Sequence, residues 1–156
     1  NTQDEHSSIM SKVGSKKMLK RLNILLDDDI TLMWEKESRK MKWNEAMEYA
    51  KSLRFGGYDD WRLPSKEELA EVVTLCGGIV ANLDDDNWEE ISNKNEVNEA
   101  YQANYKAKGF SSSNYWSSTT YAGGTSYAWD VDFDYGDQDY DSKSNDYYVR
   151  CVRSGQ

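Results

Sequence analysis

A strict alternation of apolar and acidic side chains at residues 129–134 constrains the fold more than any other feature of this chain. Successive side chains of a β-strand point to opposite faces, so the alternation predicts a strand with one face in the core and the other in solvent. The apolar residues expected in the core are Trp129, Val131 and Phe133. The acidic residues expected to be exposed are Asp130, Asp132 and Asp134.

Further strands are predicted on both sides of this segment. Period-two patterns rich in aromatic and β-branched residues occupy residues 115–118 and 147–153. A turn at residues 135–137 leads from the central strand into a further short one. These segments together predict a run of antiparallel strands near the C-terminal end of the sequence.

Two helices are predicted before the strands. Apolar residues recur at helical spacing over residues 43–53, and the glycine pair at 56–57 is expected to cap this helix. Ser65 and Glu68 have the spacing of a capping box, which predicts a second helix that stops at the glycine pair 77–78. Helices followed by antiparallel strands make the fold α+β.

The other segments show no sustained periodicity. Residues 1–22 are polar and are expected to form a tail or lead-in, with a first strand or short helix near residues 19–26. Residues 79–110 contain an acidic run and are expected to form a long, partly ordered loop. The length of the chain therefore fits one domain over residues 23–156.

Charge and the scarcity of reactive side chains argue against several functions. The formal net charge is -9, so neither nucleic acid nor insertion into an anionic membrane is expected, and no signal peptide is recognisable. The chain has one histidine, His6, and its two cysteines, Cys76 and Cys151, fit core positions. An exposed acidic row lacks the burial that raises a carboxyl pKa for acid catalysis. The chain is therefore expected not to be an enzyme.

Residues 111–148 have an unusual composition. Of these 38 residues, 27 are Ser, Tyr, Asp, Gly or Asn, a bias that a sheet does not require. Rigid Tyr combined with adaptable Ser, Gly, Asn and Asp is typical of ligand-binding surfaces. The acidic row continues with Asp137, Asp139 and Asp141. It has three interpretations: a solvated face that resists edge pairing, a calcium site resembling the start of an EF-hand loop, or a ligand-binding face.

Five segments together resemble one known domain family. They are Leu32-Met33-Trp34, Trp43-Asn44-Glu45-Ala46, Trp61-Arg62-Leu63-Pro64-Ser65 with Glu68, Tyr115-Trp116-Ser117-Ser118 and Tyr148-Val149-Arg150-Cys151-Val152-Arg153. The chain resembles the bacterial and viral domain family that also ends the Legionella collagen-like adhesin. The resemblance covers about residues 30–153.

The resemblance implies a fold and a class of function. The implied fold is C-type lectin-like, of the formylglycine-generating-enzyme subtype, with two helices packed on a twisted antiparallel sheet and long loops. Within the family, variable proteins of diversity-generating retroelements diversify solvent-facing C-terminal residues that bind ligands. The implied protein is a non-enzymatic receptor-binding or surface-display protein on a virion or cell surface. The alternative is an adhesin domain that binds glycan or protein.

The resemblance also implies site residues within a variable region, 111–148. The ligand-binding residues carried over by position are Tyr121, Gly123, Gly124, Ser126, Asp130, Asp132, Asp134, Tyr135, Asp137, Asp139 and Tyr140. The scaffold residues are Trp116, Trp129, Val131, Phe133, Val149 and Val152. The expected partner is a protein or glycan on a target surface, and a homo-oligomer is compatible with it. No cofactor is expected, with calcium as the alternative. The glycosaminoglycan ligand implied for the adhesin is not carried over, because an acidic face repels anions.

Overall fold

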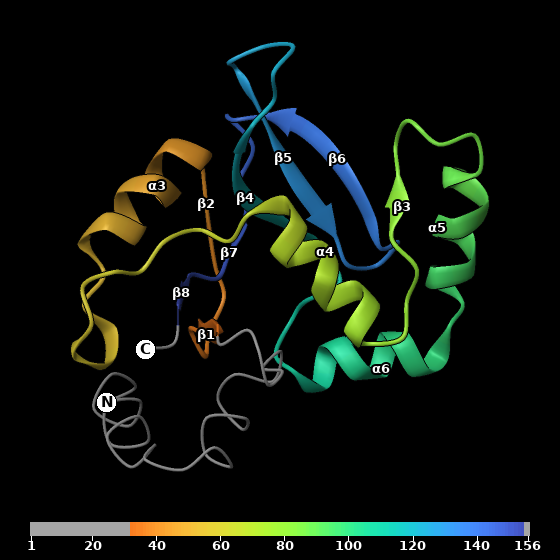
Figure 1. Cartoon of the computed structure of the whole chain (residues 1–156), viewed down its shortest axis with the longest axis horizontal. Helices are drawn as coiled ribbons and strands as arrows, with labels where there is room; N and C mark the ends of the chain where they lie inside the picture. The colour runs from red at the N-terminus through yellow and green to blue at the C-terminus, as the bar shows by residue number, and fades with distance from the viewer. Residues whose placement is uncertain (1–31, 155–156) are drawn as a thin grey trace.

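The computed structural model describes residues 32–154 (Figure 1). The helices in this range are α3 (Trp43–Ser52), α4 (Lys66–Leu75), α5 (Trp88–Glu96) and α6 (Glu99–Ala107), with the short 3-10 helix η1 (Phe55–Gly57). The strands are β1 (Leu32–Trp34), β2 (Arg39–Met41), β3 (Ala81–Asn82), β4 (Asn114–Thr120), β5 (Tyr127–Asp132), β6 (Asp137–Ser142), β7 (Tyr147–Val149) and β8 (Val152–Ser154). The predicted tail at 1–22 and the element near 19–26 lie outside the described residues.

Six strands form one mixed sheet in the order β2-β7-β4-β5-β6-β3. The pairs β3/β6 and β4/β7 are parallel, and the other neighbours are antiparallel. β1 and β8 form a separate antiparallel pair. The fold is α+β, as predicted, but the expectation of an antiparallel sheet is wrong. A parallel pair needs a crossover connection, and the chain between β3 and β6 supplies one through α5, α6, β4 and β5.

Both predicted helices are present. At the start of α4 the Ser65 hydroxyl accepts the Glu68 backbone N–H at 3.1 Å, and the Glu68 carboxylate accepts the Ser65 N–H at 2.8 Å. This is the predicted capping box. The prediction that a glycine pair caps α3 is wrong. The helix ends at Ser52, and the residue that caps it, Leu53, has an extended backbone. Gly56 instead takes a φ of 68° inside η1, where the left-handed backbone favours glycine.

Residues 79–110 are not the loop that the sequence predicts, because they hold β3, α5 and α6. Asn98 caps α6 by accepting the Tyr101 N–H, and Tyr101 and Tyr105, one turn apart, are fully buried. The buried residues of α5 are Ser92 and Asn95. A buried face of Tyr, Asn and Ser has no aliphatic periodicity, so the sequence pattern does not reveal these two helices.

The predicted strand at residues 147–153 is divided into β7 and β8 by Arg150 and Cys151. Arg150 is buried, and its guanidinium donates hydrogen bonds to the backbone oxygens of Glu35 and Lys108. The break in the strand therefore lets one side chain join two segments that are distant in sequence. Burial lowers the pKa of Arg150 to about 10, so it stays charged at neutral pH.

The large sheet lies between two hydrophobic clusters. Successive side chains of β4 enter different clusters, Tyr115 the first and Trp116 the second. β5 does the same with Val131 and Ala128. Helices α4 and α6 contribute to the first cluster and α3 to the second, and α4 crosses in front of the sheet in Figure 1. The predicted scaffold residues Trp116, Val131, Phe133, Val149 and Val152 are buried, as expected.

Candidate ligand-binding surface

The residues predicted to bind a ligand do not share one surface. In the β5–β6 register Asp130 lies opposite Asp139, and such directly opposite residues share a face. The next pair along the ladder, Trp129 and Tyr140, points to the other face. The predicted residues divide into Asp130, Asp132, Asp137 and Asp139 on one face, Tyr121 and Tyr140 on the other, Gly123, Gly124 and Ser126 in the β4–β5 loop, and Asp134 and Tyr135 in the turn after β5.

The acidic face of the hairpin consists of Asp130, Asp132, Asp137, Asp139 and Asp141. The prediction that Asp130 is exposed is wrong, because it is fully buried. Its Oδ1 accepts a hydrogen bond from Asn114 Nδ2 at 2.8 Å, whereas its Oδ2 has no partner in the described part of the chain. Its neighbour across the ladder in β4 is Trp116, so Asp130 lies on the side that the second cluster covers. Asp132 and Asp134 are half-buried rather than exposed.

Burial and crowding raise the pKa values of the acidic face. Desolvation, with contributions from Asp141 and Asp139, raises the pKa of Asp130 to about 10. Desolvation and neighbouring aspartates raise the pKa of Asp137 to about 7 and that of Asp132 to about 6. Asp130 is therefore protonated at neutral pH. The argument that an exposed row lacks the burial needed for acid catalysis is also wrong in its premise, because Asp130 is buried and the other aspartates of the row are half-buried.

The calcium interpretation concerns the same residues. In an EF-hand, the carboxylates with this spacing lie in a loop between two helices. Here they lie on β5 and in the turn that follows it. Over residues 32–154, no group of three or more Asp, Glu, His or Cys side chains is placed to hold a metal ion. Calcium binding stays a prediction.

An aromatic patch lies on the opposite face and consists of Tyr121, Tyr127, Trp129 and Tyr140. Tyr121 and Tyr140 stack with ring centroids 3.8 Å apart, and Trp129 meets Tyr140 edge-on at 5.4 Å. Tyr127 is 43% exposed. The prediction that Trp129 belongs to the core is wrong, because it is only half-buried. The helix α4 begins at Lys66, and Lys66 Nζ lies 3.9 Å from the Trp129 ring centroid. A charged group therefore covers Trp129 at a position where an apolar side chain would be needed to extend the core.

A cavity of about 270 Å³ opens beside Trp129 and is called the aromatic groove. It is lined by Lys66, Asn82, Leu83, Asp84, Asp85, Trp129 and Gln138. Gln138 Nε2 donates to Asn82 Oδ1 at 2.6 Å, which reinforces the parallel pairing of β6 with β3. The groove therefore combines an aromatic ring, two amides and charges of both signs on a hydrogen-bonded frame.

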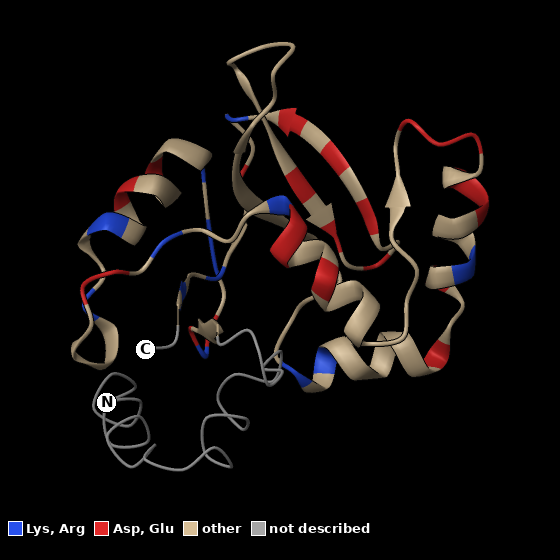
Figure 2. Cartoon of the chain, in the orientation of Figure 1, with Lys and Arg blue, Asp and Glu red and all other residues tan. Residues whose placement is uncertain are grey.

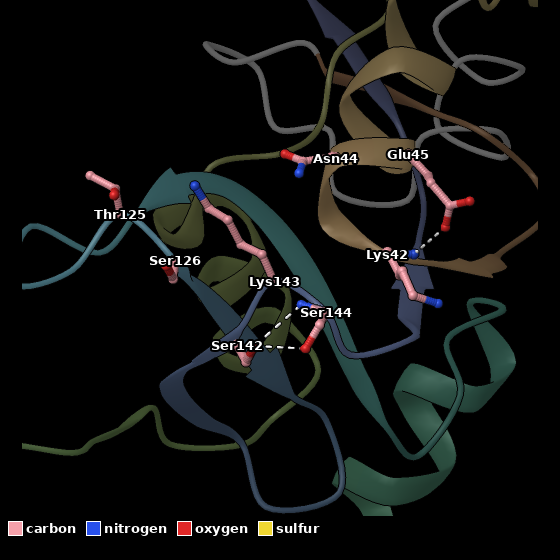
Figure 3. Close-up of a pocket in the computed structure, with 8 residues that line it drawn as sticks. All are labelled: Lys42, Asn44, Glu45, Thr125, Ser126, Ser142, Lys143 and Ser144. Carbon is pink, nitrogen blue, oxygen red and sulfur yellow. Dashed lines mark hydrogen bonds between the residues drawn. The ribbon is translucent and has the colours of Figure 1, made fainter.

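A second cavity, of about 490 Å³, is called the polar groove (Figure 3). It is lined by Lys42, Asn44, Glu45, Thr125, Ser126, Ser142, Lys143 and Ser144. The Lys143 N–H donates to the Ser126 carbonyl at 2.9 Å, and the Trp43 N–H donates to the Lys143 carbonyl at 3.2 Å. These bonds hold the β4–β5 loop, the turn after β6 and the start of α3 together. Figure 3 shows Lys143 running along the groove, with Ser142 and Ser144 at one end.

Comparison with known families confirms the family resemblance of the sequence. Residues 23–153 match the model of the Lcl C-terminal domain. The chain belongs to the Lcl C-terminal domain family. No curated protein matches it. In the part of this Lcl C-terminal domain that the structure describes, no helix has both the length and the apolar character needed to cross a membrane.

Several groove residues of this Lcl C-terminal domain carry no signal in the sequence. Lys66 follows the capping serine of α4, and its position predicts a solvated side chain. Asn82 belongs to β3, inside the segment that lacks periodicity. The acidic run that includes Asp84 and Asp85 is visible in the sequence, but its position beside Trp129 depends on the parallel pairing of β3 with β6. Long-range pairing of a two-residue strand cannot be read from local patterns.

Proposed function

We propose that this domain is a non-enzymatic, adhesin-type ligand-binding domain that recognises a protein or glycan on a target surface. Membership of the Lcl C-terminal domain family supports the proposal. The observation that carries it is the aromatic patch. The sheet has two hydrophobic clusters in which large side chains can be buried, and yet Tyr121, Tyr127, Trp129 and Tyr140 remain outside both of them.

The composition of the patch suits recognition. Tyr and Trp offer a large contact area with few rotatable bonds and a polar tip, and they are enriched among the residues that dominate binding energy. Stacking of Tyr121 on Tyr140 fixes both rings before any ligand arrives. The aromatic groove adjoins Trp129, and the polar groove includes Ser126 from the β4–β5 loop. Concave surfaces with a few convergent polar groups are typical binding sites.

We further propose that the domain has a C-type lectin-like fold and is diversified by a retroelement. The compositional bias of residues 111–148 supports this, as does the exposure of Gly123, Ser126 and Tyr127 at one end of the sheet. Side chains there have little core to lose, so substitutions are tolerated. Sequencing of the gene across related isolates tests the idea. We expect adenine-directed changes in the codons of Tyr121 and Tyr140 and none in that of Trp116.

The remaining parts of the proposal concern chemistry and location. Cys76 and Cys151 are buried, and desolvation raises the pKa of both thiols, which supports the absence of thiol chemistry. The net charge of -9 argues against nucleic acid as a partner. An adhesin-type domain acts at an extracellular, cell or virion surface. A homo-oligomer that presents several copies is compatible with this role.

The experiment is binding of the purified chain to intact target cells and to an immobilised glycan panel. The test variant carries Tyr121→Ser and Tyr140→Ser, and we expect it to lose at least about tenfold in affinity, since hot-spot aromatic residues contribute about 1.4 kcal/mol or more. The matched control is Val97→Ser, which removes an apolar side chain that is 76% exposed outside the patch. Unchanged binding by the tyrosine variant with an unchanged melting temperature would contradict the proposal.

A further inference from the structure

We propose that the aromatic groove recognises a lysine or arginine side chain from a basic segment of a partner protein. In the unliganded domain, the Lys66 ammonium group occupies the position of that side chain. The inference rests on the proposed function for its surface, but it specifies the chemistry of the ligand.

The first support is the contact that the groove already makes. Lys66 Nζ lies 3.9 Å from the centroid of Trp129, within the range of a cation–π interaction. Tyr121 and Tyr140 pack against Trp129 with ring centroids 5.9 and 5.4 Å from the indole and ring planes close to perpendicular to it. The indole is therefore held in place with a face directed at a cation. A partner cation would find the same ring face without any rearrangement of the aromatic patch.

The second support is the pair of carboxylates in the groove. Asp84 and Asp85 line it together with Lys66, and within residues 32–154 neither forms an ion pair. Asp85 Oδ2 accepts a hydrogen bond from Asn82 Nδ2 at 3.3 Å, which fixes one of the two carboxylates in the groove. An incoming ammonium or guanidinium group on the Trp129 ring would therefore lie in the field of two carboxylates that line the same groove.

The third support is the wider electrostatic field. Figure 2 shows acidic residues along β5 and β6 and in the loop between β3 and α5, the loop that supplies the groove residues Asp84 and Asp85. With a net charge of -9, the chain attracts a basic segment over a long range and repels an acidic one. An anionic ligand would meet Asp84 and Asp85. A neutral sugar would have to displace Lys66 from Trp129 without supplying a replacement charge.

The test uses a hexalysine peptide as the probe, with binding followed by titration calorimetry and by the NMR signal of the Trp129 indole N–H. The variant Lys66→Met removes the competing ammonium group and keeps the apolar stem. We expect it to bind hexalysine about three- to tenfold more tightly than the parent chain, since the partner cation no longer displaces an internal one. The double variant Asp84→Asn/Asp85→Asn should bind at least about tenfold more weakly.

A matched control separates a site from general electrostatics. The double variant Glu48→Gln/Asp59→Asn removes the same charge from positions outside the groove, and we expect its affinity to change less than about twofold. An equal loss in the two double variants would overturn the inference. Unchanged or weaker binding by Lys66→Met, with an unchanged melting temperature, would also overturn it. If the Tyr121/Tyr140 variant loses cell binding while Lys66→Met fails to respond, the proposed function stands and only the basic ligand is excluded.

Discussion

Both faces of β5 contain buried side chains, but the two faces differ in chemistry. On one face Val131 and Phe133 enter a cluster of aliphatic and aromatic side chains. On the other face Ala128 enters the second cluster, and Asp130 beside it is equally buried. Alternation in the sequence therefore shows which residues share a face, but not whether another part of the chain covers that face. The two faces should therefore respond differently to substitution and to pH.

Loss of a ring from the apolar face should have the largest effect. Phe133 is fully buried and stacks on Phe110 with ring centroids 4.6 Å apart. We expect Phe133→Ala to reduce the free energy of unfolding by about 3–5 kcal/mol, measured by urea denaturation. The control Val97→Ala, at a side chain that is 76% exposed, should stay within about 0.5 kcal/mol. Similar losses in both variants would show that Phe133 is not a core residue.

The acidic face should make stability depend on pH. The pKa values of about 6 for Asp132 and about 7 for Asp137 lie above those of the unfolded chain, so the folded state binds protons more tightly. Their stabilising contribution is complete below about pH 4 and is lost as pH rises through 6 and 7. Between pH 5 and pH 8 we expect these two groups to lose up to about 4 kcal/mol, and Asp130 adds to the loss because only the folded chain keeps it protonated; the melting temperature should fall.

The variant Asp137→Asn is the control for this pH dependence. Replacement of Asp137 removes the carboxyl whose pKa is raised to about 7, while the directly opposite Asp132 remains. We expect the melting temperature of this variant to fall less between pH 5 and pH 8 than that of the parent chain. Parallel pH profiles for the two proteins would show that the acidic face is not the cause.

The aromatic patch should respond more weakly than the core. Trp129 is half-buried and contacts Tyr121, Tyr140 and Lys66 instead of filling a hydrophobic cluster. We expect Trp129→Ala to cost about 1–2 kcal/mol in urea denaturation, well below the loss for Phe133→Ala. A cost equal to that of Phe133→Ala would place Trp129 energetically in the core.

The smallest effect is expected at the most deeply buried acid. Because Asp130 is protonated at neutral pH, an amide of the same shape replaces a neutral carboxyl, and Oδ1 can still accept from Asn114. We expect Asp130→Asn to change the free energy of unfolding by less than about 1 kcal/mol at about pH 3, where this carboxyl is protonated in the folded and the unfolded chain alike. Asp130→Ala leaves the Asn114 amide without that acceptor and should cost more, about 1–3 kcal/mol. Equal costs for the two variants would contradict this assignment.

Sequence patterns predict those helices and strands that residues close together in the sequence determine. The capping box of Ser65 and Glu68 predicts the start of α4, and alternation at residues 129–134 predicts that Val131 and Phe133 are buried. The helix α6 has a local cap at Asn98, but its buried side chains are tyrosines, whose spacing carries little weight in a search for aliphatic periodicity. The sequence thus predicts about half of the helices and most of the strands.

The candidate site was harder to predict, because its geometry depends on contacts between distant segments. The family resemblance predicts that Tyr121 and Tyr140 bind a ligand, and in the structure their rings stack on each other. Composition does not show that Asp130 points into the second cluster or that Lys66 covers Trp129. The first depends on the strands β4 and β6 that pair with β5 around Asp130, and the second on where α4 begins beside the sheet; neither has a signature in neighbouring residues.

The pairing of β1 with β8 has a mechanical consequence. Leu32 lies beside Ser154, so the chain enters and leaves the described fold at one place, while the β4–β5 loop projects at the opposite end of Figure 1. If a ligand is held near that loop and the chain is pulled from the residue before Leu32, the force passes through β1. All three residues of β1 are buried, so extraction of this strand under load requires their side chains to be drawn out of the interior. The resistance of the domain to tension therefore depends on β1, a strand far from the proposed ligand-binding surface.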